Sequence, residues 1–211
     1  MKTDDLITAL AADTLSPGRA PAHTLRLAAL FGGLLSAIVL LGLFGLRGDL
    51  VPALATWRFD AKLAIVSVAV IVALADCIRL AAPTATGWAS RASLLVPALL
   101  IAAVGLELLS VPRDALISRA VGSNALVCVL AIPALALAPL LLGLWAMRSG
   151  APVAPVAAGA AVGRLAAAIA ATLYALHCFD DSPLFVALWY SLATLPVMLL
   201  GAVAGRVALR W

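Results

Sequence analysis

The chain has 211 residues, of which 65% are hydrophobic and only 11% are charged. A soluble domain carries about a quarter charged residues, so this composition excludes a water-soluble globule and indicates an integral membrane protein. The 14 lysine and arginine residues give a formal net charge of +4 but stand singly, at the ends of apolar runs. Nucleic-acid binding needs a basic cluster, so no direct nucleic-acid partner is predicted. The expected surroundings are the lipid bilayer.

Six long apolar runs, rich in leucine and alanine, predict an all-α integral membrane protein. Each run has about 20 residues, the length that a helix needs to cross a bilayer. A membrane β-barrel would instead show short segments of alternating polarity. The predicted spans are, in chain order, Arg26–Leu46, Ala61–Leu80, Ala92–Leu109, Asn124–Met147, Pro155–Cys178 and Pro183–Leu209. We therefore predict a cytoplasmic segment of residues 1–24, followed by a six-helix transmembrane domain of residues 25–211.

The placement of lysine and arginine predicts how these helices are oriented. Six spans put both termini on one side of the membrane, and the segments on that side hold nine of the 14 basic residues. The other side holds five, and the loop at Asp180 and Asp181 holds none. By the positive-inside rule we expect both termini in the cytoplasm, with the Asp180 loop facing the periplasm or the exterior.

The first residues, MKTDDLITALAADTLSPG, predict a short amphipathic helix. Thr3 suits a helix cap, and Asp4 and Asp5 would lie in the first turn, where the helix dipole favours anions. Apolar residues follow at helical spacing, at Leu6, Ile7 and Leu10. A helix this short is marginal in water. We expect it to fold either against the protein's own membrane domain or into the groove of a cytoplasmic partner, and the sequence favours neither.

Small residues recur every four positions on the fifth predicted span and again on the sixth. The series is Gly159, Gly163, Ala167, Ala171 and Ala175, followed by Gly201 and Gly205. This spacing lets helix backbones approach closely in lipid. It is compatible with a seam between two copies of the chain, which would make a homo-oligomer. Packing between helices of one chain is the favoured interpretation.

Two carboxylates lie inside predicted spans, Asp76 late in the second and Glu107 late in the third. A charge within the membrane is costly and is therefore a functional candidate. The alternative function is accordingly a small ion- or proton-coupled transporter, although no ladder of carboxylates crosses the membrane. The sequence contains no nucleotide-binding, zinc-protease or serine-hydrolase motif, so neither an enzyme nor a cofactor is predicted.

The stretch LHCFDDSPLFVALWY, residues 176–190, places several potential metal ligands between the last two spans. His177, Cys178, Asp180 and Asp181 offer nitrogen, sulfur and oxygen donors of the kinds that zinc sites use. Neighbouring residues on a helix point in different directions, however, so the histidine and the cysteine do not easily meet one ion. The sequence up to Pro183 also suits the start of a helix. A metal site is therefore not the favoured interpretation.

The chain has three cysteines, and the predicted topology puts Cys128 and Cys178 at the outer face and Cys77 near the inner face. The outer face is oxidising in a bacterial envelope, and adjacent helices can bring two Cα atoms within the roughly 7 Å that a disulfide needs. Cysteine also packs as a small hydrophobe, so a redox pair and two unrelated residues remain equal alternatives. We expect the acidic loop to raise the pKa of the Cys178 thiol, which predicts a slowly reacting thiol.

Four features together resemble the bacterial membrane anti-sigma factors of the NrsF type. They are MKTDDLI at residues 1–7, the six spans, a cysteine early in the fourth span, and HCFDDSPLFVALWY at residues 177–190. The resemblance covers essentially the whole chain. It implies that the protein holds an extracytoplasmic-function sigma factor at the inner membrane, away from RNA polymerase, and releases it under oxidative or heavy-metal stress.

The resemblance also assigns roles to residues. The two functional cysteines fall on Cys128 and Cys178, whereas Cys77 matches no cysteine of the family. The sigma-binding segment falls on Met1 to about Asp13. With Cys178 as half of a sensor, the residues expected to support its loop are His177, Asp180 and Asp181.

Overall fold

The computed structural model describes Thr3, Ile7 and residues 21–85 and 90–210. This part of the chain is helical and contains no strand. Six of its helical segments are long and apolar enough to cross a membrane, as the sequence predicts. The main helices are α2 (Pro21–Leu43), α4 (Trp57–Leu80), α5 (Leu95–Ser110), α7 (Ala125–Met147), α8 (Pro155–Ala175) and α10 (Ser191–Ala208).

Short helical pieces join or extend these six. They are α3 (Leu50–Ala53), η1 (Arg91–Leu94), η2 (Arg113–Ala115), α6 (Leu116–Val121), α9 (Pro183–Phe185) and η3 (Val186–Tyr190). The last of these is a π-helix, which continues α9 into α10. Gly122, with φ +62°, separates α6 from α7, because glycine adopts this backbone conformation without strain.

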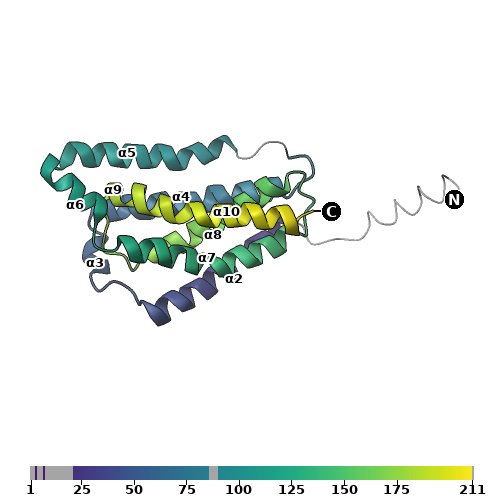
Figure 1. Ribbon diagram of the computed structural model, residues 1–211, viewed down its shortest axis with the longest axis horizontal. Coiled ribbons are helices and arrows are strands. Elements are labelled where there is room, and N and C mark those ends of the chain that lie inside the picture. The colour runs from purple at the N-terminus through teal and green to yellow at the C-terminus, as the bar shows by residue number, and fades with distance from the viewer. Residues whose placement is uncertain (1–2, 4–6, 8–20, 86–89, 211) are drawn as a thin grey trace.

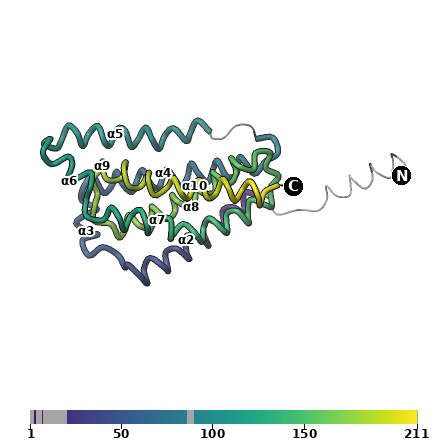
Figure 2. The backbone as a smooth tube through the Cα atoms, in the orientation of Figure 1, coloured from purple at the N-terminus to yellow at the C-terminus, as the bar shows by residue number. Residues whose placement is uncertain are grey.

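The long helices alternate in direction, so the bundle has two distinct ends (Figures 1 and 2). The N–H of Ala151 donates to the carbonyl oxygen of Ala81 at 3.0 Å, which brings together the turns after α7 and α4. The N–H of Arg47 donates to the carbonyl oxygen of Leu176 at 3.1 Å, which brings together the turns after α2 and α8. We call the end where α2 begins and α10 ends the terminal end, and the opposite end the loop end. Which side of the membrane each end faces stays a prediction.

Helix α8 is the centre of the bundle and packs against α10, α7, α4 and α2. Its small residues contact α10 directly. Gly159 lies against the backbone of Gly201 and Gly205, and a Cβ at Gly163 would lie 2.5 Å from the carbonyl oxygen of Val197. The small residues therefore form a seam within one chain, as the sequence analysis favoured.

Helix α5 lies at the edge of the bundle, along the top of Figure 1, and its span is only 11% buried. Charged groups hold it to α4 at both ends. Near the terminal end the N–H of Ser90 and the hydroxyl of Ser93 donate to the Asp76 carboxylate at 3.0 and 2.6 Å. Near the loop end Arg58 of α4 donates to Glu107 of α5 at 2.7 Å. Both carboxylates singled out from the sequence thus join helices.

Two helices begin earlier than the sequence predicts. Helix α2 begins at Pro21 rather than Arg26, because proline fits the first turn of a helix. Helix α4 begins at Trp57 rather than Ala61. The second difference matters for the functional site, since it places Lys62 inside the helix instead of at its edge.

The predicted docking segment lies mostly outside the described residues. Thr3 and Ile7 are helical and exposed. The remaining predicted docking residues, Asp4, Asp5, Leu6 and Leu10, are not among the described residues. Their role and the boundary at residue 24 therefore stay predictions.

Candidate functional site

The loop of residues 176–182, between α8 and α9, carries Cys178, and we call it the Cys178 loop. Helix α8 ends at Ala175, so Cys178 lies beyond the helix and not at the end of the span as predicted. The carbonyl oxygen of Tyr174 accepts from the N–H groups of both His177 and Cys178, at 3.0 and 2.9 Å, which closes the last turn. The next helix begins at Pro183, as the sequence predicts.

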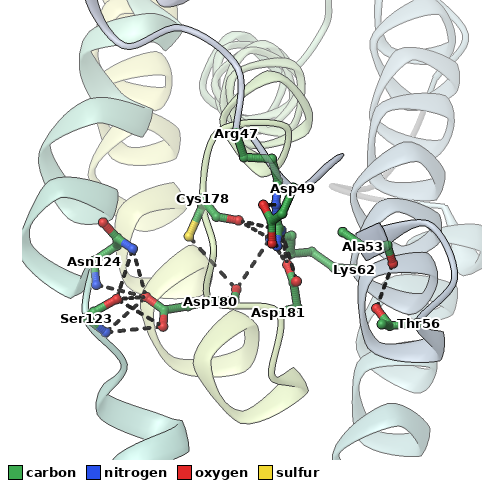
Figure 3. A network of polar contacts seen from close by, with 10 residues as sticks. All are labelled: Arg47, Asp49, Ala53, Thr56, Lys62, Ser123, Asn124, Cys178, Asp180 and Asp181. Atoms are coloured by element: carbon green, nitrogen blue, oxygen red, sulfur yellow. Dashed lines mark hydrogen bonds and ion pairs between the residues drawn. The ribbon is translucent and has the colours of Figure 1, made fainter. Parts of the chain in front are cut away.

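Two buried cations hold the Cys178 loop (Figure 3). Lys62 of α4, whose side chain is 0% exposed, donates to the Cys178 carbonyl oxygen at 2.9 Å and to the Asp181 carboxylate. Arg47, in the turn after α2, donates to the same carbonyl oxygen at 3.0 Å and to both Asp181 carboxylate oxygens at 2.9 Å. An unpaired buried charge costs several kcal/mol. These partners therefore fix where the loop lies.

Arg47 connects the Cys178 loop to the turn after α2. Its guanidinium makes two hydrogen bonds to the carboxylate of Asp49, at 2.8 and 2.9 Å. It also lies 5.1 Å from the ring centroids of Phe59 and Phe179, within the range of a cation–π contact. The hydrogen bonds from Arg47 lower the pKa of Asp49 below its ordinary value. Both groups therefore stay charged at neutral pH.

Asp180 binds the Cys178 loop to the start of α7 (Figure 3). Its carboxylate accepts from the N–H groups of Ser123 and Asn124 at 3.0 and 2.8 Å, and from the side chains of both residues. The N-terminus of a helix has free N–H groups and favours an anion. Cys128 lies one turn further into α7, where its N–H donates to the carbonyl oxygen of Asn124. Asp180 thus joins the loop of one cysteine to the helix of the other.

Cys128 and Cys178 are both 0% exposed, are not joined by a disulfide, and belong to the same apolar cluster. The Cys178 sulfur lies 3.9 Å from the carbonyl oxygen of Asp180. Burial raises the pKa of the Cys178 thiol, whereas the charge of Lys62 and the hydrogen bond to the Asp180 carbonyl oxygen oppose this rise, and the carboxylates of Asp180 and Asp181 add a smaller rise. The direction is as predicted, but burial is the main cause and not the acidic loop. A thiol of this kind reacts slowly at neutral pH.

The third cysteine, Cys77, is also free and fully buried, on α4. It lies near the terminal end, beside Asp76, and so at the opposite end of the bundle from the other two. Cys77 is therefore as buried as Cys128 and Cys178 but lies at the other end of the bundle.

The potential metal ligands of the Cys178 loop point toward different elements. The Nδ1 atom of His177 lies 3.1 Å from the carbonyl oxygen of Gly45, and its ring packs on Phe44 and Tyr174. The two aspartates of the loop bind α7 and the buried cations instead. Among the described residues, no group of three or more His, Cys, Asp and Glu side chains is arranged to hold a metal ion.

Arg47 and Lys62 are the residues of this site that the sequence analysis missed. It counted both among the charges that set the topology. The signal that could have identified Lys62 is its position inside an apolar helix, since charges within membrane helices are functional candidates. Arg47 lies outside the long helices, and no comparable signal marks it.

The two carboxylates that lie inside predicted spans are fully buried and paired with arginines. The partners are Arg58 and Arg119 for Glu107, and Arg164 and Arg79 for Asp76. These ion pairs connect α5 and α8 to the rest of the bundle. No specific observation therefore favours the coupled transporter.

Comparison with known proteins identifies the family. The model of the NrsF family, described as negative regulator of sigma F, matches residues 10–211. The chain belongs to the NrsF family. Its members are anti-sigma factors, so at this level the resemblance drawn from the sequence is confirmed.

Two curated members are similar over the full length of both chains. The anti-sigma-F factor NrsF of Caulobacter vibrioides (strain NA1000 / CB15N) is 37% identical over 218 residues, covering 100% of each chain. The probable anti-sigma-F factor NrsF of Azospira oryzae (strain ATCC BAA-33 / DSM 13638 / PS) is 34% identical over 219 residues, again covering 100% of each. No solved structure matches the chain.

Proposed function

We propose that the protein holds an extracytoplasmic-function sigma factor at the bacterial inner membrane through its N-terminal segment, and releases it when Cys128 and Cys178 react. Membership of the NrsF family supports the anti-sigma role. One observation carries the role of the cysteines. Two free, buried thiols belong to one cluster at the loop end, where Asp180 joins the loop of Cys178 to the helix of Cys128.

Two reactions would link these thiols. A peroxide would oxidise both, so that a sulfur–sulfur bond forms, the oxygen–oxygen bond breaks, and the two thiol protons leave in water. A soft heavy-metal cation would instead bind both thiolates and release the two protons to solvent. In either product the sulfur of Cys178 is drawn toward α7. The contact between Asp180 and the first N–H groups of α7 would have to change.

Helix α7 offers a route from the thiols to the N-terminal segment, because it packs along α2. The hydroxyl of Ser36 on α2 donates to the carbonyl oxygen of Leu135 on α7 at 2.6 Å. A Cβ at Gly32 of α2 would lie 2.5 Å from the Cα of Pro139 on α7. Contacts this close mean that a movement of α7 displaces α2, the helix that follows the docking segment. Release requires that the two arrangements differ in affinity for the sigma factor.

Serine substitutions test the role of the cysteines. Cys128→Ser and Cys178→Ser should each abolish induction of sigma-dependent transcription by peroxide or cadmium, measured with a reporter in cells. Cys77→Ser is the matched control, since this cysteine is equally buried but lies near the terminal end. Unchanged induction in both sensor variants would overturn the proposal.

A truncation tests the docking segment. Removal of residues 1–13 should give constitutive sigma-dependent transcription while the protein remains in the membrane fraction. The double change Asp4→Ala and Asp5→Ala should weaken sigma-factor retention more than Asp13→Ala does, because the first pair lies in the predicted first turn. Full retention by the truncated protein would place the docking surface elsewhere.

A further inference from the structure

The chain contains only two tyrosines, and the fold places both beside the two thiols. Tyr174, in the last turn of α8, and Tyr190, the last residue of the π-helix η3, are 0% and 5% exposed, with ring centroids 6.3 Å apart. Neither hydroxyl forms a hydrogen bond of normal geometry with the residues that the structure describes, and the Tyr174 hydroxyl lies beside the Cys178 thiol. Buried hydroxyl groups without a partner are rare because they are unfavourable. A phenylalanine at either position would avoid the cost of burying a hydroxyl without a partner. The presence of two tyrosines therefore suggests that the hydroxyls have a function.

The groups that surround these hydroxyls suggest that role. Both tyrosines and both cysteines belong to one cluster of buried residues. The backbone holds Tyr174 one turn before Cys178, through the hydrogen bond from the Cys178 N–H to the Tyr174 carbonyl oxygen at 2.9 Å. Both tyrosine side chains therefore lie in the cluster that holds the two thiols.

The donors and acceptors in this cluster are complementary. The Cys178 thiol donates toward the carbonyl oxygen of Asp180 at 3.9 Å, which leaves the lone pairs of its sulfur free to accept. A neutral thiol is a weak acceptor. A thiolate, or the oxygen of a sulfenate, is a charged acceptor and forms a much stronger hydrogen bond with a hydroxyl. The unsatisfied hydroxyls thus fit a reacted form of the cysteine better than the resting form.

We propose that Tyr174 and Tyr190 are positioning residues of the cysteine sensor, whose hydroxyls donate hydrogen bonds to Cys178 when it becomes a thiolate or a sulfenate. This inference rests on the proposed function of the two cysteines. With a peroxide as oxidant, the Cys178 thiolate attacks one peroxide oxygen, the oxygen–oxygen bond breaks, and the other oxygen leaves as hydroxide and becomes water. The Cys128 thiol then attacks the sulfenic acid sulfur, which forms the disulfide and releases a second water.

Thiol labelling of the full-length protein in lipid nanodiscs tests this role. In a background of Cys77→Ser and Cys128→Ser, N-ethylmaleimide reports on Cys178 alone. Tyr174→Phe and Tyr190→Phe each remove one hydroxyl and keep the ring. At least one of them should slow labelling about tenfold at a given pH and move the pH profile up by about one unit, because a hydrogen bond that stabilises the thiolate is lost.

Thr172→Val is the matched control, because it removes a hydroxyl from the same helix whose hydrogen bond goes to the carbonyl oxygen of Ala168. It should leave the labelling profile unchanged. An unchanged profile in both tyrosine variants would overturn the inference. As a second readout, protein labelled with ¹³C at the tyrosine Cζ should give two signals, and at least one should shift when peroxide oxidises the cysteines. No shift in either signal would also overturn the inference.

The two proposals fail separately. If Cys178→Ser abolishes induction but neither tyrosine variant changes the labelling profile, the role of the tyrosines is wrong and the sensor stands. If the tyrosine variants shift the profile but Cys178→Ser and Cys128→Ser leave induction intact, the sensor is wrong and the tyrosines only tune the thiol.

Discussion

The two ends of the bundle are held together by different parts of the chain. At the terminal end, Asp76 of α4 binds Arg164 of α8, and the glycine seam brings the backbones of α8 and α10 into contact. At the loop end, the buried Lys62 and Arg47 bind the Cys178 loop instead of another helix. A loop rearranges at lower cost than packed helices do. Cys128 and Cys178 therefore lie at the end where a loop, and not only packed helices, can rearrange.

The ends differ in charge as well. The segments that the topology assigns to the terminal end contain nine basic and four acidic residues, whereas those at the loop end contain five basic and six acidic residues. Four of the loop-end cations are in ion pairs with carboxylates: Arg47, Arg58, Lys62 and Arg119. The excess of positive charge thus belongs to the terminal end, as expected for a cytoplasmic face.

The largest expected effects come from removing one ion-paired carboxylate at either end. Asp76→Ala and Asp181→Ala should each lower the free energy of unfolding in detergent by about 3–5 kcal/mol. Asp76 is the buried partner of Arg164 and Arg79, and Asp181 is the carboxylate that binds the buried Lys62 and Arg47. Of these two variants, only Asp181→Ala should also speed thiol labelling of Cys178, since Asp181 helps to hold the Cys178 loop and Asp76 lies at the opposite end. Equal labelling rates in the two variants would remove the distinction between the ends.

A smaller loss of stability is expected at the seam of the terminal end. Gly159→Ala should lower the free energy of unfolding by about 1–3 kcal/mol, because its Cβ would overlap the backbone of Gly201 and Gly205. Gly105→Ala is the control, since a Cβ there meets nothing within 4 Å. It should be neutral or stabilising by up to about 1 kcal/mol. If both changes behave alike in thermal unfolding, the seam is looser than described.

Asp180→Ala should lower the free energy of unfolding less than Asp76→Ala or Asp181→Ala does. It removes the anion at the start of α7, which is worth about 0.5–2 kcal/mol at a helix N-terminus. It should also speed labelling of both Cys128 and Cys178, because it separates the loop from the helix. Asp60→Ala, at an exposed position in the first turn of α4, should change neither labelling rate. Unaltered labelling in the Asp180 variant would show that this contact does not protect the thiols.

The smallest effect concerns the pH dependence of Cys178. Because burial raises its pKa, labelling should increase about tenfold per pH unit and reach its plateau only above the ordinary value of about 8.5. Above the ordinary pKa, the unfolded chain loses the Cys178 proton while the folded protein still holds it. The free energy of unfolding should therefore fall slightly as the pH rises above about 8.5. A plateau below pH 8 would indicate a thiol activated by Lys62.

The long helices could be predicted from the sequence because each is a continuous apolar run. The partners of the Cys178 loop could not, since Arg47 and Lys62 reach Asp181 across 134 and 119 positions. Hydropathy gives helix lengths but not which faces meet. A predicted start at Ala61 made Lys62 look like an interfacial charge, and the earlier start of α4 buries it. The ion pairs of Arg47 and Lys62 with Asp181 could therefore be found only from the structure.

Retention of the sigma factor by the full-length protein in nanodiscs tests most directly whether thiols at the loop end control the terminal end. The sigma factor bound by the wild-type protein, by Cys128→Ser and by Cys77→Ser would be measured before and after peroxide. We predict that peroxide releases it from the wild-type protein and from Cys77→Ser but not from Cys128→Ser. Equal release from all three proteins, or none from the wild type, would contradict the account.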